Sequence, residues 1–131
     1  MAKRKELNPK WPWAEKFGFH SGVQVGNTVY VSGTVGWDPD GNIVGPDDML
    51  AQSRQAFANL REVLAEAGAT LDDVVKINAF LTDIDRYGEY SQARAEAFTG
   101  NLPASTAVAT PALIDPGLLV EIEAVAEIGS G

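Results

Sequence analysis

The stretch "VEIEAVAEI", residues 120–128, alternates apolar and mostly acidic side chains and determines the fold class. Side chains of a strand point alternately to its two faces, so this pattern predicts one apolar face: Val120, Ile122, Ala124, Ala126 and Ile128. The opposite face carries Glu121, Glu123, Val125 and Glu127. The stretch "VVKINAFL", residues 74–81, predicts a second two-faced strand, with Val75, Ile77, Ala79 and Leu81 on its apolar side. We expect both apolar faces to pack against helices.

Helices and turns flank these strands in an order that predicts an α+β sheet. The segments "FHSGVQV" and "TVYVSG" read as two strands joined by a tight turn at Gly26-Asn27, after an N-terminal arm of residues 1–17. A helix capped by Asp47 or Asp48 ends near Gly68, and a second helix covers about residues 84–98. The segment "STAVAT", starting at position 105, predicts a buried strand facing the glutamates of residues 120–128. The predicted order is β-β-α-β-α-β-β, with two helices on one face.

The second face of the predicted sheet mixes charged residues with three apolar ones, Val74, Phe80 and Val125. A single two-layer chain leaves this face in water. Burial against further copies of the chain removes the apolar side chains from solvent, so we expect a homo-oligomer.

Composition limits the possible partners. The chain has 131 residues, which suits a single domain spanning residues 1–131, and it contains no cysteine. Its net charge is −8 and its only basic cluster is Lys3 to Lys5, so we expect no nucleic-acid partner. No apolar run is long enough to span a bilayer and the N-terminus lacks a secretory pattern, so we expect no membrane association and a cytoplasmic location.

Glu121 and Glu123 are the strongest candidates for proton transfer, because a carboxyl group with a raised pKa can act as a general acid or base. The alternative is an ion pair with Lys76 or an arginine across an interface between subunits, which we favour for Glu123. His20, the only histidine, is a possible acid or base or a half-buried structural residue. One histidine and no cysteine make a metal site improbable, and Trp11, Trp13 and Trp37 either wall a pocket or pack the arm onto the body.

Several segments together resemble the RidA (YjgF) family of reactive-intermediate enamine/imine deaminases. They are "VGNTVYVSGTVG", "QSRQAFANLREVLAEAGATLDDVVKINAFLTDID", "YGEYSQARAEAFTG", "LPASTAVAT" and "LLVEIEAVA", which cover roughly residues 18–128. The resemblance implies a chorismate-mutase-like fold and a homotrimeric barrel with the helices outside. It also implies small-molecule clefts between subunits and hydrolysis of imines to keto compounds and ammonia without a cofactor.

The resemblance also assigns site residues. The family's water-activating glutamate falls on Glu121, and the "SG" that lines its cleft falls on Ser32 and Gly33, whose amides would hold developing charge. Four family residues differ: the carboxylate-binding arginine is Ser105, an asparagine is Ser91, a cysteine is Ala107 and a tyrosine is Phe19. The chain therefore resembles an arginine-lacking subgroup.

The missing arginine predicts loss of the family's standard 2-imino acid deaminase activity and leaves two possibilities for the ligand. Another cation (Arg86, Arg94 or Lys16) enters the cleft, or the ligand lacks an α-carboxylate and is larger and more neutral, between aromatic walls at Phe19 and Trp37. We expect Glu121 to act as general acid and base, with Ser105 and Thr106 orienting an imine, enamine or related C=N compound. The alternative functions are a non-catalytic small-molecule-binding or regulatory trimer and, least favoured, RNA cleavage.

Overall fold

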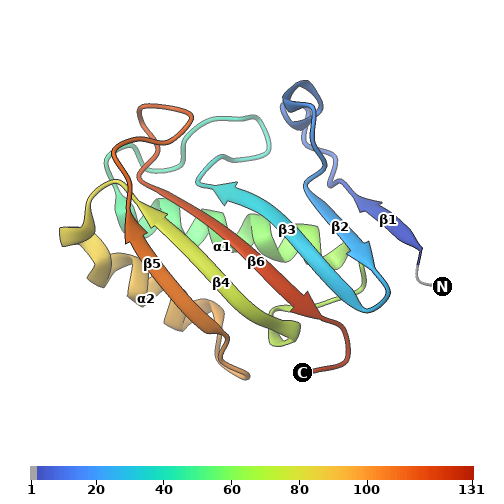
Figure 1. Cartoon of the computed structure of the whole chain (residues 1–131). Coiled ribbons are helices and arrows are strands. Elements are labelled where there is room, and N and C mark those ends of the chain that lie inside the picture. Colours follow the sequence, from blue (N-terminus) through green and yellow to red (C-terminus); the bar gives the residue numbers. More distant parts are fainter. Residues whose placement is uncertain (1–2) are drawn as a thin grey trace.

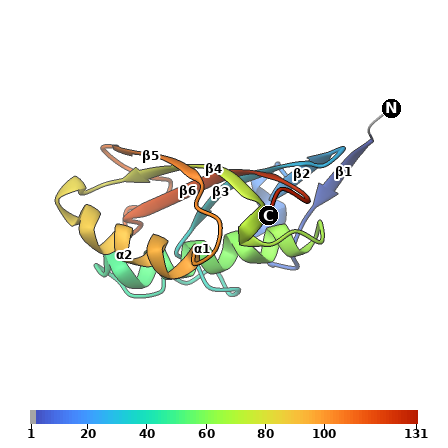
Figure 2. The same ribbon diagram turned by 90° about the horizontal axis from the view of Figure 1, so that it is seen from below.

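The structure is a computed structural model that describes residues 3–131, and it consists of one mixed sheet with two helices on one face (Figures 1 and 2). The strand order is β1-β2-β3-β6-β4-β5. The strands are β1 (Arg4–Leu7), β2 (Gly22–Val25), β3 (Thr28–Val35), β4 (Val74–Leu81), β5 (Ala104–Ala109) and β6 (Val120–Glu127). The helices are α1 (Met49–Ala65) and α2 (Tyr87–Ala97). The predicted fold class is confirmed, and the arm adds a sixth strand.

Strand β6 lies at the centre of the sheet, antiparallel to both β3 and β4. The alternation that predicted it is borne out, since Val120, Ile122, Ala124 and Ala126 are all buried on the helix side. The intervening side chains, including Glu121 and Glu123, are half-buried on the opposite face. This arrangement places two carboxylates side by side on the face that the chain's own helices do not cover.

Helix α1 begins where its sequence predicts, since the Asp48 side chain accepts a hydrogen bond from the Ala51 amide at 2.9 Å. It packs on the sheet together with α2, and Phe57 of α1 stacks against Tyr90 of α2 with ring centroids 5.9 Å apart. The second helix is shorter than the predicted range because a separate 3-10 turn, Ile84–Arg86, precedes it.

One prediction for β4 is wrong at its first residues. Val74 is buried on the helix side, whereas Val75 is 43% exposed, the reverse of the expected arrangement. The β4–β6 register shifts between Val74 and Lys76, and this irregularity reverses the alternation for the residues before it. From Ile77 to Leu81 the predicted faces are correct.

Strand β5 also differs from its prediction, because it is an exposed edge strand paired in parallel only with β4. Ser105 pairs with Ile77 and Thr106 with Asn78, so β4 separates both of them from the glutamates of β6. Among residues 3–131, no helix is both long and apolar enough to cross a membrane.

Candidate active site

Glu121 lies over the backbone of Gly33, at a local irregularity between β3 and β6. Between the pairs Val31–Ala124 and Thr34–Ile122, two residues of β3 stand opposite the single residue Glu123. A methyl group added at Gly33 would lie 2.7 Å from the Glu121 carboxyl carbon, so only glycine leaves room for this side chain. The irregularity therefore creates the space that the carboxyl group occupies.

The environment of Glu121 favours its protonated form. Burial raises the pKa of Glu121, and the neighbouring charge of Glu123 raises it further. Within residues 3–131, no side chain or amide donates a hydrogen bond to this carboxyl group and no cation pairs with it. Within residues 3–131 no cation pairs with Glu121 or Glu123, since Lys76 donates to Thr106 at 2.8 Å and Glu123 accepts from Asn78 at 3.3 Å. An ion pair across a subunit interface stays a prediction.

The carboxyl group of Glu121 lines a cavity of about 540 Å³ whose walls are largely aromatic. The residues predicted for the site that line it are Phe19, Ser32, Gly33, Trp37 and Glu121. Its other aromatic walls are Trp11, Trp13, Phe17 and Phe80, and the segment after β5 adds Leu113 and Ile114. This combination of one carboxyl group and apolar rings suits a ligand with a substantial apolar part.

The N-terminal arm both packs on the body and walls the cavity, so the two readings of its tryptophans hold together. Trp11 stacks on Trp13 with centroids 5.2 Å apart, and Trp13 meets Trp37 edge-on at 5.0 Å. Phe17 stacks on Trp37 at 5.8 Å. The Trp13 indole donates to the Asp38 carbonyl at 3.2 Å. No sequence motif marks Phe17 as a site residue, because its place in the cavity depends on how the arm folds back.

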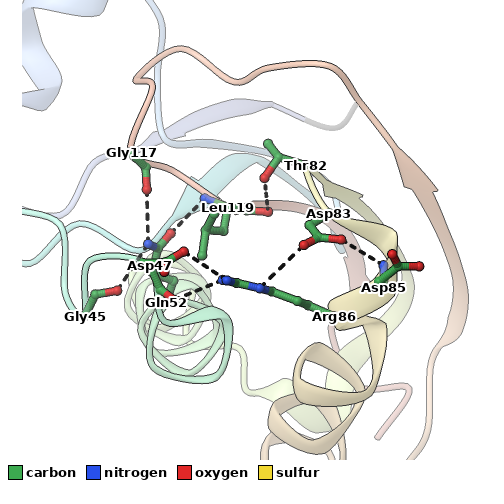
Figure 3. A network of polar contacts seen from close by, with 9 residues as sticks. All are labelled: Gly45, Asp47, Gln52, Thr82, Asp83, Asp85, Arg86, Gly117 and Leu119. Carbon is green, nitrogen blue, oxygen red and sulfur yellow. Dashed lines mark hydrogen bonds and ion pairs between the residues drawn. The ribbon is translucent and has the colours of Figure 1, made fainter.

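A polar network fixes the two loops that flank the cavity (Figure 3). The buried Gln52 side chain donates to the carbonyls of Gly45, at 3.3 Å, and Gly117, at 3.1 Å, and accepts from the Leu119 amide at 2.9 Å. Nearby, Arg86 donates to Asp47 at 2.9 Å and pairs with Asp83. Both of these carboxylates neutralise Arg86, so we no longer consider it as the cation that binds the ligand.

The backbone near Ser32 differs in part from its predicted role. The Ser32 amide donates to the Ser21 carbonyl at 2.9 Å, and its hydroxyl donates to the His20 carbonyl at 2.7 Å. The Ser32 amide is therefore not free to hold developing charge, and Gly33 is the remaining candidate. His20 itself accepts from Asn8 at 2.9 Å, lies 3.3 Å from Glu6, and lines a neighbouring hollow instead of the Glu121 cavity.

The other predicted ligand residues lie away from Glu121 within one chain. Ser105 and Ala107 are in register with Ile77 and Ala79, which face the helices, whereas Glu121 faces the opposite way. Ser91 lies on α2, and the Thr106 hydroxyl accepts a hydrogen bond from Lys76 at 2.8 Å. None of these four residues lines the Glu121 cavity. The chain alone therefore brings together only part of the predicted site.

Of the three cations considered for the ligand, Arg94 is the one that reaches Ser105. Its Nη1 donates to the Ser105 hydroxyl at 3.3 Å and to Tyr87 at 3.0 Å, and its Nη2 donates to Ser91 at 3.1 Å. Lys16 instead lies 5.9 Å from the Phe17 ring centroid. Within the described part of the chain, no cluster of three histidine or acidic side chains is placed to hold a metal ion.

Comparison with known proteins points consistently to one family. The sequence profile of the family described as Endoribonuclease L-PSP matches residues 14–128. The 2-iminobutanoate/2-iminopropanoate deaminase of Mus musculus is 38% identical over 111 residues, which are 85% of this chain and 82% of the mouse protein. The Rattus norvegicus protein of the same name is also 38% identical, over 85% of this chain and 80% of the rat protein.

Solved structures give the same result. A Mycobacterium tuberculosis protein of the YjgF/YER057c/UK114 family is 37% identical, with a TM-score of 0.84, covering 96% of this chain and 100% of its own. RidA from the Antarctic bacterium Psychrobacter is 33% identical, with a TM-score of 0.87, covering 95% of this chain and 99% of its own.

Proposed function

Because this chain belongs to the Endoribonuclease L-PSP family, which includes RidA and YjgF proteins, we propose that it hydrolyses an imine or enamine to a keto compound and ammonia. The observation that carries the proposal is the Glu121 carboxyl group, which lies in an aromatic-walled cavity, has a raised pKa and has no hydrogen-bond or ion-pair partner among residues 3–131. A carboxyl group in such an environment can deliver and accept protons.

The proposed steps use Glu121 alone for proton transfer. The protonated carboxyl group donates its proton to the carbon of an enamine, which gives the iminium form of the C=N bond. The resulting carboxylate then takes a proton from water as the water oxygen bonds to the iminium carbon. The amino alcohol so formed transfers a proton to nitrogen and breaks the C–N bond, which releases ammonia and leaves the C=O bond. The Gly33 amide is the proposed donor to the oxygen of the amino alcohol, where negative charge develops as the proton moves from this oxygen to nitrogen.

The cavity supports a substrate with a large apolar group. Ser105 carries no charge, so it cannot neutralise a substrate carboxylate as the family arginine does. Imines of propanoate and butanoate, for which the mouse and rat relatives are named, offer only a short alkyl chain to a cavity of about 540 Å³. We expect imines with larger apolar side chains to be hydrolysed faster than 2-iminopropanoate.

The proposed active form is a homotrimer with the cleft between subunits. Support comes from the separation of Glu121 from Ser105 on opposite faces of one chain and from the exposed edge strand β5. The net charge of −8 disfavours RNA as the substrate.

The test uses imines generated in the assay by an amino-acid oxidase from alanine, leucine or phenylalanine, with the rate of imine loss as the readout. We expect Glu121→Gln to lower the protein's acceleration of imine loss about 100-fold or more, since general acid–base groups contribute about 10²- to 10⁴-fold to a reaction rate. The matched control is Glu123→Gln, two residues along the same face, for which we expect a change of no more than a few-fold.

Full activity in Glu121→Gln would refute the assigned role. Absence of acceleration by the unmodified protein, combined with a ligand-induced rise in melting temperature, would instead indicate the non-catalytic binding protein.

A further inference from the structure

Arg94 is a cation held in place by neutral groups only. Its three hydrogen bonds go to the hydroxyls of Tyr87, Ser91 and Ser105, and its guanidinium lies 5.6 Å from the Tyr87 ring centroid and 5.4 Å from that of Tyr90. A guanidinium has five N–H donors, and these bonds use both donors of Nη1 and one of Nη2. The donors left over within residues 3–131 are the Nε–H and one Nη2–H.

The other arginines with ordered polar contacts are neutralised. Arg54 makes a two-pronged pair with Glu96, with both distances at 2.8 Å, and Arg86 contacts Asp47 and Asp83. Arg94 is half-buried, and no carboxylate of the described chain lies within ion-pair distance of it. A positive charge withdrawn from water in this way is stabilised by an anion that supplies the missing partner.

A second observation concerns Tyr90, beside the guanidinium. The Tyr90 side chain is fully buried, and its hydroxyl lies beside Arg94 and Ser105 without a hydrogen bond of good geometry to either. Burial raises the pKa of Tyr90, so that the hydroxyl keeps its proton. The Tyr90 ring and hydroxyl therefore cover one side of the guanidinium and withdraw part of the Arg94 charge from water.

We propose that Arg94, together with the Ser105 hydroxyl, forms a carboxylate-binding site that serves the substrate of the proposed reaction. Two parallel N–H···O bonds from the remaining edge of a guanidinium match the two oxygens of a carboxylate. The substrate class is thereby narrowed to imines or enamines that carry a carboxylate as well as a large apolar group. This inference rests on the proposed function for the identity of the ligand.

The position of the site requires a second copy of the chain for catalysis. Ser105 and α2 lie on the helix side of β5, whereas Glu121 faces the opposite side of the sheet. One substrate contacts both only when the β5 edge of one copy lies against the Glu121 cavity of a neighbour. Arg94 on α2 would then replace the family arginine, whose position on the strand is occupied by Ser105 in this chain.

The experiment measures binding instead of turnover. The probes are 4-methyl-2-oxopentanoate, the keto product expected from the leucine-derived imine, and its uncharged methyl ester, titrated calorimetrically into the full chain. We expect the acid to bind more tightly than the ester. Arg94→Met should weaken binding of the acid by about 10- to 100-fold, because charge-assisted hydrogen bonds are lost, and should leave the affinity for the ester unchanged. Arg54→Met is the matched control and should alter neither affinity.

Arg94→Lys provides a second variant that keeps the charge, and we expect it to retain part of the preference for the acid. Equal binding of acid and ester by the unmodified protein, or an unchanged preference in Arg94→Met, would overturn the proposal. Failure of both probes to bind a protein that still hydrolyses the leucine-derived imine would overturn the carboxylate site alone. Loss of imine hydrolysis with the acid preference intact would instead overturn the proposed function.

Discussion

Replacing Gln52 by methionine tests whether the polar network of Figure 3 holds the cavity loops in place. Methionine nearly matches the volume of glutamine, so the change removes hydrogen bonds without opening a large cavity. It leaves the carbonyls of Gly45 and Gly117 and the amide of Leu119 without their present partner. Each net hydrogen bond contributes about 0.5–1.5 kcal/mol, and a stranded buried group costs about 1–3 kcal/mol. The Gly45 bond, at 3.3 Å, is the weakest of the three.

We therefore expect Gln52→Met to lower the free energy of unfolding by about 2–4 kcal/mol, the sum of two ordinary bonds and one long one. The assay is urea unfolding at one fixed protomer concentration, because assembly makes stability depend on concentration. Gln92→Met is the matched control: Gln92 is exposed on α2, and its replacement should change stability by no more than about 0.5 kcal/mol. If Gln52→Met lowers the free energy of unfolding by less than about 0.5 kcal/mol, the network does not hold the loops in place.

Three further predictions concern the site and the assembly. Because burial and Glu123 raise the pKa of Glu121, the folded chain holds that proton more tightly than the unfolded chain, and stability falls as pH rises from the unfolded value of 4.5 through the folded pKa. Glu121→Gln should therefore raise the melting temperature at pH 7, with a difference that disappears near about pH 4, and a lowered melting temperature at pH 7 would contradict this assignment. Gly33→Ala should displace the Glu121 side chain, because the added methyl group would lie 2.7 Å from its carboxyl carbon. We expect turnover to fall by about 10-fold or more with little change in melting temperature. Unchanged turnover would show that the position of the carboxyl group is not critical. Light scattering at micromolar concentration should give the mass of three protomers, and a stable monomer would contradict the composite cleft.

The alternation of residues 120–128 predicted the central strand, because burial of one face dictates that pattern, and the caps predicted the bounds of α1. Strand β1 was not predicted, because "RKEL" has no alternating apolar pattern and becomes a strand only by pairing with β2. The reversed facing of Val74 and Val75 was also not predictable, since nothing in the segment "VVKINAFL" indicates a shift of register.

The site was predictable where one local segment carries it and not where two elements meet. Glu121 and Gly33 follow from short motifs, and the structure places them in contact distance. Arg94 was one of three possible cations by sequence, and only the packing of α2 beside β5 brings it to Ser105. The hydrogen bond of the Ser32 amide to Ser21 was also not predictable, because it depends on how the chain approaches β2.

The central position of β6 has a consequence for how the protein is made. Strands β1 to β3 form one half of the sheet and β4 with β5 the other, and β6 is the strand that pairs with both halves. A ribosome synthesises β6 after every element that it joins, so neither half of the sheet can be completed while residues 120–127 remain in the exit tunnel. During that interval the nascent chain exposes the edges of β3 and β4 and the apolar side of α1, which are the surfaces that chaperones recognise. Completion of the sheet therefore waits until β6 has left the ribosome, and until then the nascent chain needs more protection from aggregation than a chain whose central strand is made first.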